Sequence, residues 1–178
     1  MTQLDRLTLE MTRYYSGDPK RIQHFIKVHA FAALIARLEN LPEEDRLVLE
    51  CAALTHDIGI KPAEEKYGSC VGRLQESEGP PVARDMLSRL GFPDALIERV
   101  CAMIAHHHTY TGIDTKELQI LIEADFLVNL YEDGESRAAI GTAVGRIFRT
   151  DSGIALAREI FGLYRPNEHS PSFDKNRK

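Results

Sequence analysis

Apolar residues recur three or four positions apart along most of the chain, which is the spacing of one face of an α-helix. This pattern predicts helices over residues 4–15, 19–38, 43–55, 80–90, 94–105, 116–131, 135–150 and 152–163. No stretch shows the alternation with a period of two that a half-buried strand requires. The fold class is therefore predicted to be all-α.

Residues 58–78 have the weakest helical pattern, because glycine and proline interrupt it repeatedly. We expect a long irregular connection there, either functional or partly mobile, with Pro80 and Pro81 starting the next helix. The chain has 178 residues, a length that suits one domain with a sizeable core. We expect a single domain over residues 1–164 and a polar, flexible tail over residues 165–178.

Composition narrows the partners and the surroundings of the protein. The chain has 22 Lys and Arg against 27 Asp and Glu, a formal net charge of −5. This argues against broad nucleic-acid binding, because no basic excess exists to neutralise phosphates. The three cysteines lack CxxC spacing, which indicates a reducing compartment, and no apolar run approaches membrane-spanning length. We expect a cytoplasmic protein without membrane contact, and a homo-oligomer is compatible with the sequence.

The doublet of His56 and Asp57 ends the otherwise apolar run 51–55. Burying a carboxylate without a partner is costly, and a divalent metal ion would be a suitable partner. His24 and Asp125 lie on other predicted helices and could complete a ligand set. For His24 the alternative is an ordinary histidine satisfied by a backbone carbonyl, and for Asp125 it is a pair with Lys or Arg of a neighbouring helix.

Asp125 shares its predicted helix with a second carboxylate, Glu123. Two residues correspond to about 200° around a helix, so the two side chains cannot face one site. Ile122, Phe126 and Asn129 lie on the same side as Asp125. We therefore expect Asp125 to be buried and Glu123 to be solvated.

Two imidazoles and two carboxylates suit a divalent ion: Mn, Fe, Co, Ni or Zn, with Mg as a further option. On an octahedral ion, four protein ligands leave positions for water and for a substrate oxygen. Such an ion lowers the pKa of bound water to ~7–9 and polarises a phosphoryl oxygen. The predicted set is therefore suited to hydrolysis of a phosphate ester.

These residues resemble the HD-domain superfamily of metal-dependent phosphohydrolases, which has a His, a His-Asp doublet and a distant Asp on consecutive core helices. The matching segments are 21–28, 52–59 and 123–129 within a resemblance that spans roughly residues 20–132. The resemblance implies one metal ion with this ligand set: His24, His56, Asp57 and Asp125. It also implies an HD-domain-like helical bundle of five core helices, to which this chain adds N- and C-terminal helices.

The sequence departs from that family at two places. Many members have Lys directly after the Ile-Gly that follows the doublet, whereas Lys61 comes one residue later here; we assign a catalytic role to Lys61 together with Asp57. Members with two metal ions have a further His where Gln75 stands. One ion per chain is therefore expected, unless Glu76 or Glu78 acts as a substitute ligand for a second ion.

Three consecutive histidines, His106, His107 and His108, follow a predicted helix. Consecutive helical residues point about 100° apart, so all three cannot face one site. We expect His107 to point inward as a catalytic residue that binds the phosphate, protonates the leaving oxygen or binds a second ion. Solvent and the helix dipole, which favours His at a C-terminus, account for at least one of the others.

Four further side chains are candidates for substrate binding, each with the alternative of a plain surface or turn residue: Lys27, Lys66, Arg73 and Tyr110. The resulting hypothesis is a metal-dependent phosphohydrolase that acts on a nucleotide or another small phosphate ester. A nucleotide-binding or regulatory domain with little turnover is one alternative. A di-iron oxygenase is another, if two metal ions bind. The residues do not identify the substrate or the metal.

Overall fold

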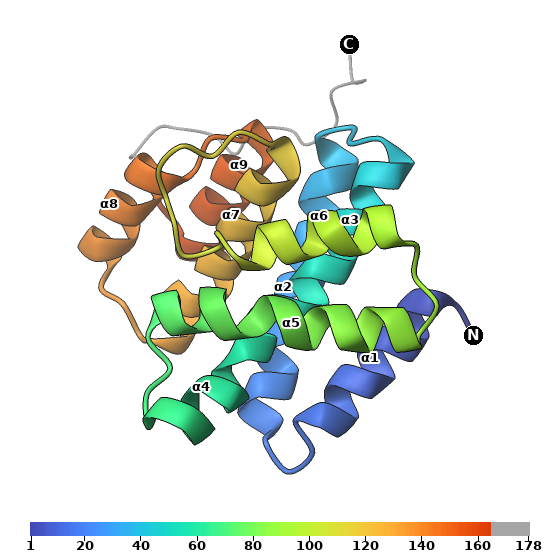
Figure 1. Ribbon diagram of the computed structural model, residues 1–178. Coiled ribbons are helices and arrows are strands. Elements are labelled where there is room, and N and C mark those ends of the chain that lie inside the picture. The colour runs from blue at the N-terminus through green and yellow to red at the C-terminus, as the bar shows by residue number, and fades with distance from the viewer. Residues whose placement is uncertain (165–178) are drawn as a thin grey trace.

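The computed structural model describes residues 1–164, and these residues form a bundle of helices (Figure 1). The elements are α1 (Gln3–Tyr14), α2 (Pro19–Leu38), α3 (Glu43–Thr55), the 3-10 turn η1 (His56–Gly59), α4 (Ile60–Tyr67), α5 (Gly72–Arg89), α6 (Asp94–Ile104), α7 (Lys116–Glu132), α8 (Arg137–Ile147) and α9 (Asp151–Phe161). The predicted all-α class is confirmed, with α1 before the central helices and α8 and α9 after them. The predicted tail, residues 165–178, lies outside the described residues.

Side-chain caps determine where two of the central helices begin. Asp18 accepts a hydrogen bond from the backbone N–H of Arg21, and Pro19 is the first residue of α2. Thr115 accepts one from the backbone N–H of Leu118 at the start of α7. These caps set the register of the two helices that carry His24 and Asp125.

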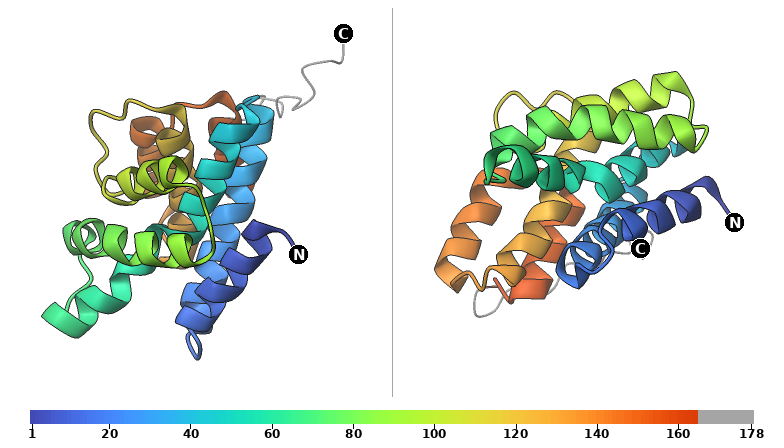
Figure 2. Two further views of the ribbon diagram at one scale, coloured as in Figure 1. Left: turned by 45° about the vertical axis from the view of Figure 1, so that its right-hand side comes forward. Right: turned by 60° about the horizontal axis from the view of Figure 1, so that its bottom comes forward.

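The helices α2, α3 and α7 form the centre of the bundle. α2 packs against both α3 and α7, and α3 also contacts α6 and α7. α5 lies beside α6 and across η1, so these two helices cover one side of the centre (Figures 1 and 2). α8 and α9 contact α7 on the side of the molecule away from α1. Among residues 1–164, no helix combines the length and apolarity needed to cross a membrane.

Residues 58–78 are helical apart from a short break, so the predicted irregular connection is wrong. η1 and α4 extend through Tyr67, and α5 begins at Gly72. Pro80 and Pro81 lie inside α5 rather than at its start. Proline lacks the N–H that the helical ladder uses, but packing against η1, α4 and α6 supports α5 on both sides of the interruption.

Glycines in this region allow close contact between η1 and α5. A Cβ atom on Gly59 would lie 2.5 Å from the carbonyl oxygen of Gln75 and 2.7 Å from the backbone nitrogen of Gly79. A Cβ atom on Gly79 would lie 2.6 Å from the side chain of Ile104. These glycines therefore serve interhelical packing, which in a sequence looks the same as a glycine-rich loop.

Glu123 and Asp125 of α7 are both buried, so the predicted solvation of Glu123 is wrong. Glu123 faces the segment between α8 and α9, where it accepts hydrogen bonds from the backbone N–H groups of Arg149 (2.6 Å) and Thr150 (2.9 Å). The hydroxyl of Thr150 and the side-chain amide of Gln119 (2.8 Å) also donate to it. Four donors satisfy this carboxylate, although burial raises its pKa. Asp125 is buried on another side of α7, as predicted.

Replacing Gly59 with Ala is expected to destabilise the protein by about 1–3 kcal/mol, because backbone atoms of α5 occupy the space of the new methyl group. Gly141→Ala on the exposed face of α8 is the control: a Cβ atom there meets nothing within 4 Å, and the change should stabilise the helix by up to about 1 kcal/mol. Urea unfolding measures both changes. Equal stabilities of the two variants would contradict the close contact between η1 and α5.

Candidate metal centre

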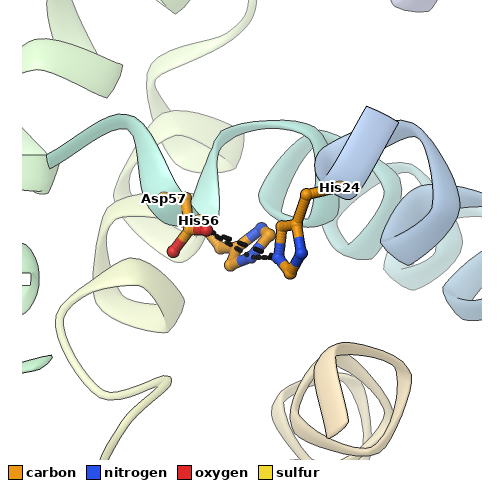
Figure 3. A group of neighbouring side chains, drawn as sticks. All are labelled: His24, His56 and Asp57. Carbon is orange, nitrogen blue, oxygen red and sulfur yellow. Dashed lines mark hydrogen bonds and ion pairs between the residues drawn. The ribbon is translucent and has the colours of Figure 1, made fainter. Parts of the chain in front are cut away.

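The four predicted ligands meet at one place: His24 on α2, His56 and Asp57 on η1, and Asp125 on α7. The Nε2 atoms of His24 and His56 are 3.3 Å apart. The Nε2 atom of His24 lies 3.4 Å from Asp57 Oδ2 and 3.2 Å from Asp125 Oδ1. The corresponding distances from His56 Nε2 are 3.4 and 3.5 Å. Figure 3 shows the two rings and the Asp57 carboxylate directed toward one another.

Two tyrosines at the end of α1 fix the turn that carries the doublet. The hydroxyl of Tyr15 donates to the carbonyl oxygen of Asp57 at 2.7 Å, and that of Tyr14 donates to the carbonyl oxygen of Ile58 at 3.2 Å. Burial raises the pKa of Tyr14 to about 12 and raises that of Tyr15 as well. Both hydroxyls therefore stay protonated and can donate these hydrogen bonds. A four-residue turn has little stability of its own, and these bonds hold its backbone from outside.

The hydrogen bonds of the two rings indicate which nitrogen carries a proton. Nδ1 of His56 faces the carbonyl oxygen of Ala53 at 2.9 Å, and Nδ1 of His24 faces Glu132 Oε2 at 3.1 Å. A carbonyl and a carboxylate only accept, so in a neutral ring the proton lies on Nδ1 and the lone pair on Nε2. The two lone pairs therefore converge between the two carboxylates.

His24, His56, Asp57 and Asp125 form one cluster, and its two carboxylates lack the usual partner of a buried carboxylate, a Lys or Arg side chain of residues 1–164. Within residues 1–164, Asp57 and Asp125 form ion pairs with histidines and with no Lys or Arg. The side-chain amide of Asn129 donates to Asp125 at 2.9 Å. A buried set of two imidazole nitrogens and two carboxylates requires added positive charge, and its donor atoms fit a divalent transition-metal ion.

Protons supply this charge when no metal is bound. Burial acts to lower the pKa of His56, but the carboxylates of Asp57 and Asp125 outweigh it and raise that pKa to about 9. Burial acts to raise the pKa of Asp57, yet His56 and His107 lower it to about 2. The pKa of Asp125 also lies far below its usual range despite burial, because His24 and His56 hydrogen-bond to it. A metal ion would compete with protons for the same imidazole nitrogens.

Among the three consecutive histidines, His107 is the buried one, as predicted. Its side chain is 1% exposed, and its Nδ1 donates to the carbonyl oxygen of Ile104 at 2.7 Å. Its Nε2 lies 3.7 Å from Asp57 Oδ1 and has no hydrogen-bond partner in the described part of the chain, which is uncommon for a buried polar atom. His106 is exposed, and its Nδ1 bonds to the carbonyl oxygen of Ala102 at the C-terminal end of α6, where the helix dipole favours a histidine.

Gln75 and His108 occupy the place beside His107. Gln75 donates through its amide to the carbonyl oxygen of Cys70 (2.7 Å), which leaves its Oε1 to accept from Nε2 of His108 (3.2 Å). Burial and the neighbouring His107 lower the pKa of His108 to about 4. Asp57, His107 and His108 are close enough to hold an ion, but Nε2 of His108 would first have to lose its bond to Gln75. One ion per chain therefore stays the prediction.

The carboxylates predicted as substitute ligands for a second ion form other contacts. Glu76 accepts a hydrogen bond from the backbone N–H of His108 at 3.0 Å. Glu78 pairs with Lys66 and accepts from the hydroxyl of Tyr67 at 3.0 Å. Using either carboxylate as a ligand would break these contacts.

Three predicted basic residues lie away from the cluster. The ammonium of Lys61 lies over the ring of Tyr14, 5.1 Å from its centre. Lys66 pairs with Glu78, and Arg73 is exposed. None of the three lines the cavity beside the ligands. The catalytic role of Lys61 and the substrate contacts of Lys66 and Arg73 therefore stay predictions, and this geometry adds no support for them.

The other two predicted substrate-binding residues lie close to the ligands. Lys27 pairs with Glu132, whose second carboxylate oxygen faces His24. Tyr110 is 41% exposed, and its hydroxyl lies 3.4 Å from Nδ1 of His108. Contacts of these two side chains with a substrate stay predictions.

A cavity of about 310 Å³ lies beside His24, Asp57 and Asp125. Its lining also includes Asn129 and Glu132. Glu132 was not among the predicted site residues, although helical spacing gives a signal: it follows Asp125 by seven residues and Asn129 by three, so all three share one side of α7. A carboxylate in the last turn of a helix otherwise looks like a solvated residue.

Comparisons with known proteins agree with this geometry. A family model described as HD domain matches residues 21–130, more than half of the chain. No curated protein matches this chain. A solved crystal structure of a predicted HD superfamily hydrolase from an uncultured Thermotogales bacterium is similar, with 25% identity and a TM-score of 0.65 over 90% of this chain and 86% of that one.

Metal-free protein is expected to lose stability as the pH rises from 6.5 toward 9. The pKa of His56 is about 9 in the folded state against 6.5 for an ordinary histidine. Its protonated form therefore stabilises the fold fully below pH 6.5, and this contribution, on the order of 3 kcal/mol, disappears as the pH rises through 9. Urea unfolding in the presence of a chelator measures the change.

The same titration with Zn²⁺ or Mn²⁺ added is the control for this pH dependence. The added ion should stabilise the protein more at pH 9 than at pH 6.5, because fewer protons compete for the imidazole nitrogens. Metal-free stability that stays constant across this window would contradict the proton-binding cluster.

Proposed function

The chain belongs to the HD domain family, and on that premise we propose that it is a metal-dependent phosphohydrolase acting on a nucleotide or another small phosphate ester. One observation carries the proposal: two imidazole lone pairs and two carboxylates converge beside a cavity. Within residues 1–164, no Lys or Arg pairs with these carboxylates. The similar hydrolase structure supports the same class of reaction.

One divalent ion per chain would be held by His24, His56, Asp57 and Asp125. Two nitrogen and two oxygen donors suit Mn, Fe, Co, Ni or Zn better than Mg, which prefers oxygen ligands. When bound, such an ion would polarise a phosphoryl oxygen and lower the pKa of a water molecule toward neutrality. Side chains around the ion would bind the phosphate and transfer protons.

We assign phosphate binding or proton transfer to His107, which lies beside Asp57. Its Nδ1 is anchored on the carbonyl oxygen of Ile104, so the ring is held with Nε2 toward Asp57. That Nε2 is buried and has no hydrogen-bond partner among residues 1–164. A protonated His107 would donate a hydrogen bond to a phosphate oxygen, or give its proton to the leaving oxygen.

The cavity supports a small substrate. Its volume of about 310 Å³ is at the lower end of the ~300–1,000 Å³ found for ligand sites. Lys20 and Arg21, at the start of α2, also line it. Arg21 pairs with Asp18 and Glu64, whereas Lys20 forms no ion pair within residues 1–164 and can contact an anionic group.

A second candidate function, oxygen chemistry at two irons, requires a second ion. Asp57 supports this candidate because it belongs to two groups of potential ligands, one with His24 and His56 and one with His107 and His108. Metal stoichiometry separates the two functions: one ion per chain supports the phosphohydrolase, and two irons per chain support the oxygenase.

Replacing Asp57 with Ala is expected to abolish metal retention, because the variant leaves three ligands and removes one of two negative charges. Phosphate ester hydrolysis should fall by about 10³-fold or more. Elemental analysis after gel filtration measures the metal, and p-nitrophenyl phosphate and bis(p-nitrophenyl) phosphate report hydrolysis of a monoester and a diester.

His29→Ala is a matched control, because His29 also lies on α2 and pairs with a carboxylate, Glu50, at 2.9 Å. It should keep the metal and the activity of the wild-type protein. The proposal fails if wild-type protein loaded with Mn, Fe, Co, Ni or Zn hydrolyses neither ester, or if Asp57→Ala keeps its metal.

A further inference from the structure

The imidazoles of His24, His56 and His107 differ in the group that accepts a hydrogen bond from Nδ1. Nδ1 of His56 bonds to the carbonyl oxygen of Ala53, and Nδ1 of His107 bonds to that of Ile104. Nδ1 of His24 instead faces a side-chain carboxylate, Glu132, at 3.1 Å.

Helix geometry explains this difference. Ala53 and Ile104 lie in the last turns of α3 and α6, where backbone carbonyls have no partner within the helix and are free to accept from a histidine just beyond the end. His24 lies inside α2, where the carbonyls around it are used by the helix itself. Its ring can therefore be oriented only by a group from another element.

Glu132 is held for this task by a second contact. Its Oε1 pairs with the ammonium of Lys27, one turn after His24 on α2, while Oε2 faces the imidazole. The Glu132 side chain is 12% exposed. Both oxygens of Glu132 are therefore engaged, one by the ammonium of Lys27 and the other by the imidazole of His24.

We propose that Glu132 is a positioning residue of the metal centre: it holds the proton of His24 on Nδ1 and so directs the Nε2 lone pair at the ion, while Lys27 holds Glu132 in place. This inference rests on the metal site of the proposed function. A carboxylate behind a ligating imidazole fixes its tautomer and orientation and makes it a better electron donor. Lys27 then supports the metal centre rather than contacting substrate.

Glu132→Gln is the decisive variant because it nearly keeps the shape of the side chain. Lys27 attracts the amide oxygen, which leaves the NH₂ group facing Nδ1 of His24. A donor at that position forces the proton onto Nε2, where it blocks the metal. We expect the dissociation constant for Zn²⁺ or Mn²⁺ to rise about 10–100-fold, measured by competition with a chromophoric chelator.

Glu50→Gln is the matched control, because Glu50 faces Nε2 of His29, another histidine of α2, at 2.9 Å. It removes the same kind of carboxylate–imidazole pair away from the cluster, and its metal affinity should stay within about 2-fold of the wild type, well below the loss expected at the site. The double variant Lys27→Met/Glu132→Gln should recover part of the affinity, because the amide is then free to turn its oxygen to His24.

Nitrogen-15 NMR of the zinc-loaded wild-type protein should show the proton of His24 on Nδ1 and the metal on Nε2. A Glu132→Gln variant with wild-type affinity, a double variant no better than Glu132→Gln, or a His24 that binds zinc through Nδ1 would each overturn the inference. Wild-type protein that binds no metal at all would be a different result, because it removes the proposed function itself.

Discussion

Two carboxylates and two imidazole nitrogens face one another in the interior of this protein. They are stable side by side only with added positive charge, and the surrounding helices must hold them in place. Buried lone pairs of carboxylate oxygens and imidazole nitrogens repel one another unless a proton or a metal ion lies between them. Holding them together requires rigid support: α2 packs tightly on α7 and α3, and the tyrosines of α1 bond to the backbone of η1. The stability of the central helices is thus what keeps the cluster preorganised for an ion.

Glycines in η1 and α5 allow a close helix contact that also bears on how many metal ions the site can bind. Gly59 and Gly79 let α5 approach the turn that carries Asp57, and this approach places Gln75 beside the cluster. Gly72 has the same effect at the start of α5, where a Cβ atom would lie 2.7 Å from the ring of His108. The amide of Gln75 then engages His108, so the helix that completes the wall of the site also opposes a second ion.

The sequence predicts that the four candidate ligands lie together, and it predicts them better than it predicts their surroundings. His24, the doublet and Asp125 are recognisable because polar groups in apolar helical stretches stand out, and burial of His107 follows from the 100° step between helical residues. The irregular connection predicted over residues 58–78 fails because a glycine needed for packing and a glycine needed for a turn look alike. Helical spacing places Glu132 on the same side of α7 as Asp125, but its contact with His24 of α2 depends on how the two helices pack, which the spacing does not reveal.

Glu123 and Asp125 show why burial alone does not identify a functional carboxylate. Both lie on α7, yet the protein satisfies Glu123 with four donors that need no charge. Asp125 receives one amide bond from Asn129 and otherwise faces two imidazole nitrogens, which can donate to it only when they carry an added proton. Burial raises the pKa of Glu123 despite these donors, whereas despite its burial hydrogen bonds from His24 and His56 hold the pKa of Asp125 far below its usual range. A carboxylate whose partners need an added proton before they can donate is the one that marks a site for a cation.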